Sequence, residues 1–189
     1  DVLCFGGCLF NRMRREAAEL NEAAQDLLRL SEGLGFSSFG GTGACYCGSA
    51  KAMLGHPREG IAHLREGLEI RQSIGARCHL SGILGALAEA QTQAGLLEEG
   101  LDTVAKALAF VEETGERHWE AELQRIRAVL LSLLGDEPEA EAGMHRALEV
   151  ARRQGARSWE LRAAVSLARL WQAQGRSGNA LPMLAEIYG

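Results

Sequence analysis

The chain has 189 residues, of which 47% are hydrophobic and 24% are charged, and its formal net charge is −5. A chain of this length can bury a sizeable core without a disulfide or a metal. Both signs of charge are interspersed, so there is neither the basic stripe of a nucleic-acid-binding protein nor the polybasic segment of a membrane-surface protein. We therefore expect neither nucleic acid nor a membrane as a partner.

The sequence also lacks segments that direct a protein out of the cytoplasm. No apolar run reaches the roughly 18–20 residues of a membrane span. The first ten residues, DVLCFGGCLF, are apolar, but no basic region precedes them, so they do not form a signal peptide. The five cysteines are an odd number, which favours reduced thiols in the cytoplasm, and we expect all of them to be small buried residues rather than metal ligands. The sequence has no initiator Met and starts at Asp1 as if in the middle of a helix, so we expect a piece of a longer chain.

Glycines recur with a fixed period, which is the most informative pattern in the chain. One set is spaced by forty residues and a second set has the same period, half a repeat out of phase. The two sets are Gly55, Gly95, Gly135, Gly175 and Gly35, Gly75, Gly115, Gly155. This period is typical of stacked helical hairpins, in which a glycine ends each helix in the left-handed conformation.

The segment 118–155 shows the unit most clearly. Apolar residues at helical spacing predict a first helix over about 119–134, which Gly135 ends. The sequence Asp136-Glu137-Pro138 then opens a second helix, because acidic residues favour the positive end of a helix and proline is tolerated in its first turn. Ser158 is the expected N-cap of the next first helix. Trp119, Trp159 and Trp171 are expected to pack between helices.

Small residues keep the same register where paired helices must approach closely. A generic alanine-rich bundle would have no reason to keep this register. The in-phase sets are Gly48, Ala88, Ala128, Ala168; Gly60, Gly100, Ala140, Ala180; and Gly67, Ala107, Ala147. We therefore predict an all-α fold, a right-handed α-α superhelix of four to five hairpins in a single domain over 1–189. The expected units are 1–35, 36–75, 76–115, 116–155 and 156–189.

Small residues on both sides of a turn glycine resemble the tetratricopeptide repeat (TPR), here lengthened to about forty residues. The segments 87–108, 114–123 and 147–176 carry the resemblance, together with the C-terminal Leu184-Ala185-Glu186-Ile187-Tyr188-Gly189. They look like the repeat region of bacterial signalling ATPases linked to adenylate/guanylate cyclase domains, or of LuxR- or maltose-activator-type transcriptional regulators. The resemblance implies a protein-interaction or sensor segment without a catalytic residue.

Two segments depart from the pattern. Residues 36–49 are rich in glycine, which weakens a helix, but the register still predicts a helix over about 39–54. Pro182 lies inside the last helix and is compatible with it only if that helix starts late, near Asn179. We expect the apolar face of this last repeat to be exposed, which makes a homodimer through it possible.

No pattern of catalytic, cofactor-binding or metal-binding residues is present. Gly43 and Gly48 have the spacing of a phosphate-binding loop, but Ser49 and Ala50 stand where Lys and Ser or Thr are required. The five histidines form no HExxH pair and no zinc pattern. We therefore expect no enzyme, no cofactor and no metal.

The first helices of such a superhelix line its concave face, where a protein or peptide partner would bind. Superposing the TPR pattern on the turn glycines predicts the polar side chains of this face. They are Glu89, Gln93, Glu122, Arg125, Arg162, Arg169 and Gln172. A solvated face without a partner, a small-ligand sensor and a self-association module are the alternatives.

Overall fold

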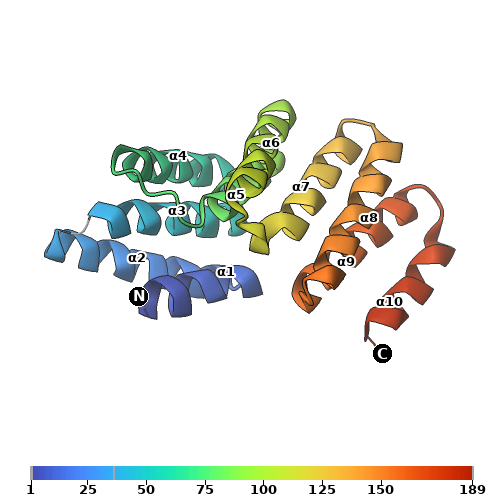
Figure 1. Cartoon of the computed structure of the whole chain (residues 1–189), viewed down its shortest axis with the longest axis horizontal. Helices are drawn as coiled ribbons and strands as arrows, with labels where there is room; N and C mark the ends of the chain where they lie inside the picture. The colour runs from blue at the N-terminus through green and yellow to red at the C-terminus, as the bar shows by residue number, and fades with distance from the viewer. Residues whose placement is uncertain (1, 36, 189) are drawn as a thin grey trace. The chain divides into compact units, whose positions relative to one another are not determined.

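The structure is a computed structural model that describes residues 2–35 and 37–188. Every regular element in these ranges is a helix (Figure 1). In chain order the elements are η1 (Val2–Leu9), α1 (Phe10–Arg14), α2 (Ala17–Leu34), α3 (Ser37–Met53), α4 (Pro57–Ser73), α5 (Leu80–Gln93), α6 (Leu97–Thr114), η2 (Arg117–Trp119), α7 (Glu120–Leu133), α8 (Glu137–Arg153), α9 (Arg157–Ala173), η3 (Ser177–Asn179) and α10 (Ala180–Tyr188).

The glycine period is confirmed as a series of helix ends. All eight predicted turn glycines have positive φ values, from 64° at Gly155 to 91° at Gly55. A residue with a Cβ atom is disfavoured in this left-handed region, so glycine is the natural choice at each turn. The backbone therefore repeats every twenty residues, as the sequence predicted.

The chain divides into two compact units, 1–96 and 97–189, and the division falls between α5 and α6. Within unit 1, each helix from α2 to α5 packs against the next one, and α3 also contacts α5. Within unit 2, the helices from α6 to α10 pack in the same sequential way, and α7 also contacts α9. Contacts between helices one or two apart in sequence are those of stacked hairpins.

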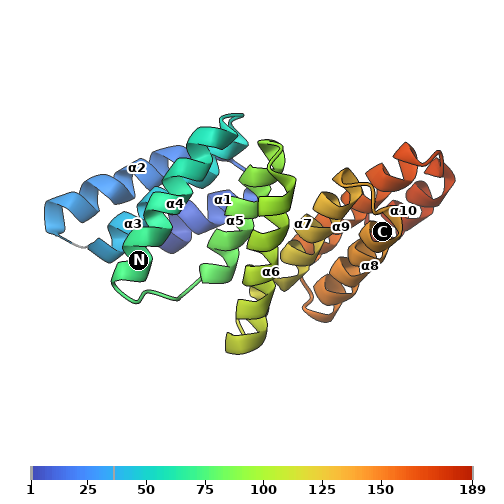
Figure 2. The ribbon, with the colours of Figure 1, turned by 90° about the horizontal axis from the view of Figure 1, so that it is seen from above.

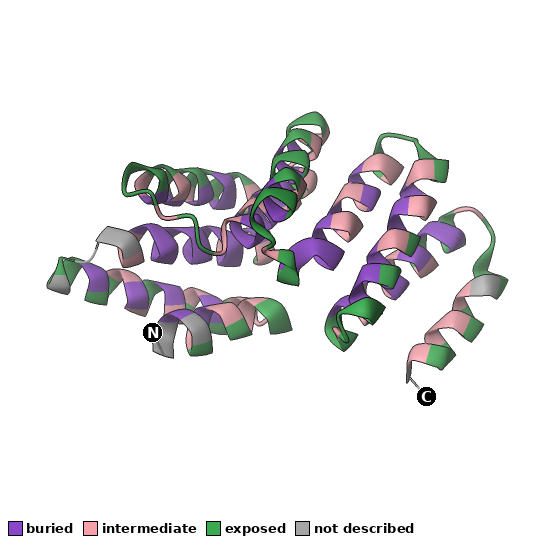
Figure 3. Ribbon diagram, viewed as in Figure 1, coloured by how far each residue is buried: buried purple, intermediate pink, exposed green. Residues whose placement is uncertain are grey.

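Helix α3 confirms the helix expected in the glycine-rich segment. Each residue from Gly41 to Ala50 is buried (Figure 3), and α3 packs against α2, α4 and α5. A Cβ atom on Gly48 would lie 2.6 Å from the carbonyl oxygen of Gly60, and one on Gly67 would lie 2.6 Å from that of Gly41. The glycines are therefore explained by the close approach of α3 and α4, which lie side by side in both ribbon views (Figures 1 and 2).

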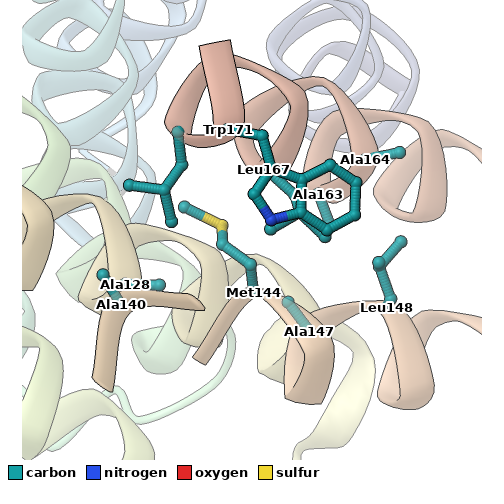
Figure 4. Packing of buried hydrophobic residues seen from close by; sticks show 10 residues of the cluster. Ala128, Ala140, Met144, Ala147, Leu148, Ala163, Ala164, Leu167 and Trp171 are labelled. Carbon is teal, nitrogen blue, oxygen red and sulfur yellow. The ribbon is translucent and has the colours of Figure 1, made fainter. Parts of the chain in front are cut away.

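One hydrophobic core cluster of unit 2 lies between α7, α8, α9 and α10. Met144 of α8 and Trp171 of α9 point into the same space, close to Leu167 and Ala163 (Figure 4). Trp119 and Trp159 are also buried, and their ring centroids are 5.1 Å apart. The prediction that the three tryptophans are packing residues is confirmed.

Several helix ends follow the sequence and one does not. The Asp136 side chain accepts a hydrogen bond from the Glu139 N–H, and α10 begins at Ala180, late enough to place Pro182 in its first turn. Ser158 is not an N-cap, because α9 already begins at Arg157 with Ala156 in the cap position. That prediction was wrong by two residues, since the sequence motif Gly-Ala-Arg closes the turn sooner than the serine suggested.

Candidate functional site

The polar residues predicted for the face of the first helices fall in both units. Gln93, Arg169 and Gln172 are exposed, and the other four are buried or partly buried. In unit 1, Arg15 Nη1 lies 2.7 Å from Glu89 Oε1, so this carboxylate has a partner from the segment after α1. Arg12 Nη2 donates to the Gly82 carbonyl oxygen at 2.6 Å on the same helix α5.

In unit 2, three of the predicted residues form one ion-pair cluster. Arg125 donates from Nε and Nη2 to the two carboxylate oxygens of Glu122, at 2.8 and 2.7 Å. Arg162 of α9 places Nη2 2.6 Å from Glu122 Oε1 of α7. The Glu122 side chain is only 5% exposed, so two cations compensate a buried carboxylate.

This cluster also fixes the arginines on the surface that α7 and α9 share. The Arg162 guanidinium lies over the Trp159 ring, 5.3 Å from its centroid, and Arg125 Nη1 is 3.4 Å from Ser166 Oγ. Arg169 and Gln172 follow Arg162 on α9 and are exposed. We call the set Glu122, Arg125, Arg162, Arg169 and Gln172 the α7–α9 polar surface. Three arginines and one glutamate give it a positive charge, although the whole chain is negative.

Cavities occur at equivalent positions of three repeats. One in unit 1, of about 500 Å³, is lined by residues of α2, α3 and α4 that include Leu28, Ser31 and Gly40. The corresponding cavity forty residues later has a volume of about 490 Å³. Its lining residues are Leu68, Arg71, Gln72, Gly75, Ala76, Arg77, Leu80 and Leu84. In unit 2, a cavity of about 340 Å³ is lined by Arg152, Gly155, Arg157, Glu160 and Glu186.

Arg71 is a residue that the sequence interpretation missed. It is a charged side chain only 4% exposed, on the wall of the 490 Å³ cavity. Its place in the repeat is the signal that could have revealed it. The residues at the equivalent positions of the other repeats, Ser31, Val111 and Ala151, are uncharged, so Arg71 is the one charged residue among the four.

The cysteines do not belong to a cluster of metal-ligand side chains in the part of the chain that the structure describes. All five are free thiols, and no described group of three or more His, Cys, Asp or Glu side chains could hold a metal ion. Four are buried as expected, but Cys78 is exposed, because it lies in the turn before α5.

Among the described helices, none combines the length and apolar character that crossing a membrane requires.

No family model matches the chain. An uncharacterised protein of Rhizobium meliloti (strain 1021) is 30% identical over 164 residues, which cover 86% of this chain. The chain spans only 16% of that relative's length.

Solved structures give the fold. PlcR of Bacillus thuringiensis, in complex with the peptide PapR7 and DNA, matches with a TM-score of 0.77 and 14% identity over 98% of this chain and 68% of that one. A putative kinesin light chain of Podosopora anserina with TPR-like repeats matches with a TM-score of 0.65 and 17% identity, over 100% of this chain and 95% of that one. The apo form of RapI matches with a TM-score of 0.66 and 14% identity, over 97% of this chain and 51% of that one. The chain therefore has the all-α, TPR-like helical-repeat fold that the sequence predicted.

Proposed function

We propose that this chain is a non-catalytic segment of a larger bacterial signalling protein and that it binds a protein or a peptide. Its fold is that of PlcR, which was solved with a bound peptide, and its similar relative is a much longer bacterial protein. The five free thiols support a cytoplasmic location, where thiols stay reduced.

The α7–α9 polar surface is the observation that carries this proposal. Glu122 holds Arg125 by two hydrogen bonds and Arg162 by an ion pair, at N–O distances of 2.6–2.8 Å, so their side chains lose little freedom when a partner binds. Arg169 and Gln172 extend the surface with exposed donors. Because arginine binds carboxylates with two parallel hydrogen bonds, the preferred partner is an acidic peptide.

The test uses Arg169, because reversing Arg125 or Arg162 would also break the internal ion pairs. Labelled heptapeptides containing two or three Asp or Glu residues are titrated with the chain, and binding is followed by fluorescence anisotropy. Arg169→Glu should weaken binding of the best peptide by about tenfold or more. Lys106→Glu is the matched control, since Lys106 is exposed on α6 and gives the same change in charge. Equal effects of the two substitutions would reject this surface.

A small-ligand sensor is the second candidate, and one specific observation favours it. The 490 Å³ cavity of unit 1 has the size of small-molecule sites, which span roughly 300–1,000 Å³. Leucines form much of its wall, together with the buried Arg71.

A further inference from the structure

Arg71 occupies a position at which the repeat otherwise places a small or apolar side chain. The equivalent residues Ser31, Val111 and Ala151 are all buried, with exposed fractions of 6%, 0% and 0%. Arg71 is just as buried, at 4%. Packing alone would be satisfied by a valine or an alanine, so the guanidinium needs another explanation.

The contacts of Arg71 leave its charge without a carboxylate. Nη1 donates to Thr42 Oγ1 at 2.6 Å, and Nη2 donates to the carbonyl oxygen of Cys78 and lies 3.5 Å from its Sγ atom. Nε is buried without a hydrogen-bond partner. None of the described residues forms an ion pair with Arg71. A buried cation that is bound only by neutral acceptors is costly, and a buried unpaired N–H adds to that cost.

The cavity beside Arg71 combines this cation with an apolar wall. Leu68, Leu80 and Leu84 supply apolar surface, and Arg77 and Gln72 supply the other long polar side chains. No Asp or Glu is among the described residues that line it. The cavity therefore offers positive charge and hydrophobic surface together.

The equivalent cavity in unit 2 contains the carboxylate that this one lacks. Leu80 corresponds to Glu160, whose Oε1 accepts from Arg152 Nε at 2.7 Å and whose Oε2 accepts from Arg157 Nη1 at 3.3 Å. Glu120, at the same position of the preceding repeat, pairs with Arg117 at 3.1 Å. Two repeats thus have a buried glutamate beside their arginines, whereas the repeat with Arg71 has a leucine.

We propose that the cavity between α4 and α5 binds a small aliphatic monocarboxylate. Its carboxylate would pair with Arg71, close to the place that the Glu160 side chain occupies in the equivalent cavity of unit 2, and its hydrocarbon chain would lie against Leu68, Leu80 and Leu84. The proposal deepens the second candidate function by naming the ligand class, and it does not depend on the α7–α9 polar surface.

Three ligands of equal chain length test the charge requirement. Octanoate, octanol and octylamine are titrated into the whole chain by isothermal calorimetry. Octanoate should bind, octanol should bind about tenfold more weakly or worse, and octylamine should not bind. Equal affinity for octanoate and octanol, or no binding of octanoate, would overturn the proposal, whatever the acidic peptides do.

Three substitutions test the position of the site. Arg71→Val, which introduces the residue of the equivalent position 111, should weaken octanoate binding by about tenfold or more. Arg58→Gln removes an exposed cation from the same helix and should change nothing. Leu80→Glu should also abolish octanoate binding, because the new side chain places a carboxylate in the cavity at the position that Glu120 and Glu160 have in the later repeats. If Arg71→Val does not fold, Leu80→Glu is the variant that tests the proposal. Octanoate binding that survives Leu80→Glu in a chain with an unchanged circular dichroism spectrum would place the ligand elsewhere and overturn the assignment.

Discussion

Arg162 of α9 and Glu122 of α7 form an ion pair, with Nη2 of Arg162 2.6 Å from Oε1 of Glu122. The two residues are 40 positions apart, so they occupy equivalent positions of consecutive repeats. Arg125 binds the same carboxylate from its own helix. The Arg125 and Arg162 side chains are 11% and 23% exposed, so the cluster is largely shielded from water. It joins two consecutive first helices of unit 2 and therefore affects stability as well as the surface.

Glu122→Gln tests the structural role of this cluster. The substitution keeps the shape of the side chain but removes the negative charge that pairs with Arg125 and Arg162, which should lower the free energy of unfolding by about 2 kcal/mol. Urea denaturation of the whole chain measures the change. Glu149→Gln is the control, because Glu149 is exposed on α8, and it should cost less than about 0.5 kcal/mol. Equal losses in both variants would show that the cluster adds nothing to stability.

The sequence predicted that Glu122, Arg125 and Arg162 share one face but not how they pair. Helical spacing and the forty-residue register were enough to put Glu122, Arg125 and Arg162 on one face. The pairing depends on the distance between α7 and α9, which side-chain packing sets and which no spacing rule provides. The role of these residues in binding a partner stays a prediction, as does the single domain over 1–189.

Arg71 and Ser158 show the two ways in which the sequence interpretation failed. The helix of Arg71 has an ordinary amphipathic pattern, so only comparison with the buried residues Val111 and Ala151 indicates that Arg71 faces inward. Residue type alone predicts a cap at Ser158, but Gly155 already allows the chain to turn into α9 two residues earlier. The turns were predicted correctly from their glycines because a backbone with positive φ strongly favours glycine over residues with a Cβ atom.

Two glycine substitutions should change stability in opposite directions. A Cβ atom on Gly60 would lie 2.6 Å from the Gly48 carbonyl oxygen and 3.0 Å from Ala52 Cβ, so Gly60→Ala should force α3 and α4 apart and cost about 2 kcal/mol. Nothing lies within 4 Å of a Cβ atom on Gly33, near the end of α2. Gly33→Ala should therefore stabilise the chain by about 0.5 kcal/mol through helix propensity. Thermal unfolding measures both, and a stable Gly60→Ala variant would contradict the close packing of α3 and α4.

The cysteines should react at different rates with a thiol reagent. Burial raises the pKa of the Cys8 and Cys45 thiols to about 12 and also raises the pKa values of Cys4 and Cys47, whereas Cys78 is exposed. Since the thiolate is the reactive form, one thiol should react quickly at pH 8 and four only after unfolding. Cys78→Ser should remove the fast phase, and a fast phase that persists in this variant would contradict the burial of the other four.

The buried thiols of Cys8 and Cys45 should make the free energy of unfolding fall as the pH becomes alkaline. The ordinary pKa of a cysteine is 9.0 and those of folded Cys8 and Cys45 are about 12, so between these values the unfolded chain binds fewer protons than the folded chain. The stabilising contribution is complete below about pH 9 and is lost as the pH rises towards 12. A variant with Cys8→Ala and Cys45→Ala should lose stability less steeply over this range in denaturation experiments. Parallel curves for the two proteins would contradict the shifted pKa values.

Helix α10 offers the surface for the predicted self-association. Leu181 is 75% exposed, while Met183, Leu184 and Ile187 pack against the core of unit 2. Burying an exposed leucine side chain contributes about 1.5–3 kcal/mol, so two copies that meet through α10 should form a weak dimer at high concentration. Light scattering should then show a mass that rises with concentration in the wild-type chain but not in Leu181→Glu. Leu30→Glu is the matched control, because Leu30 is also exposed, at 51%, but lies on α2. A dimer that Leu30→Glu disrupts while Leu181→Glu leaves it intact would move the contact away from α10.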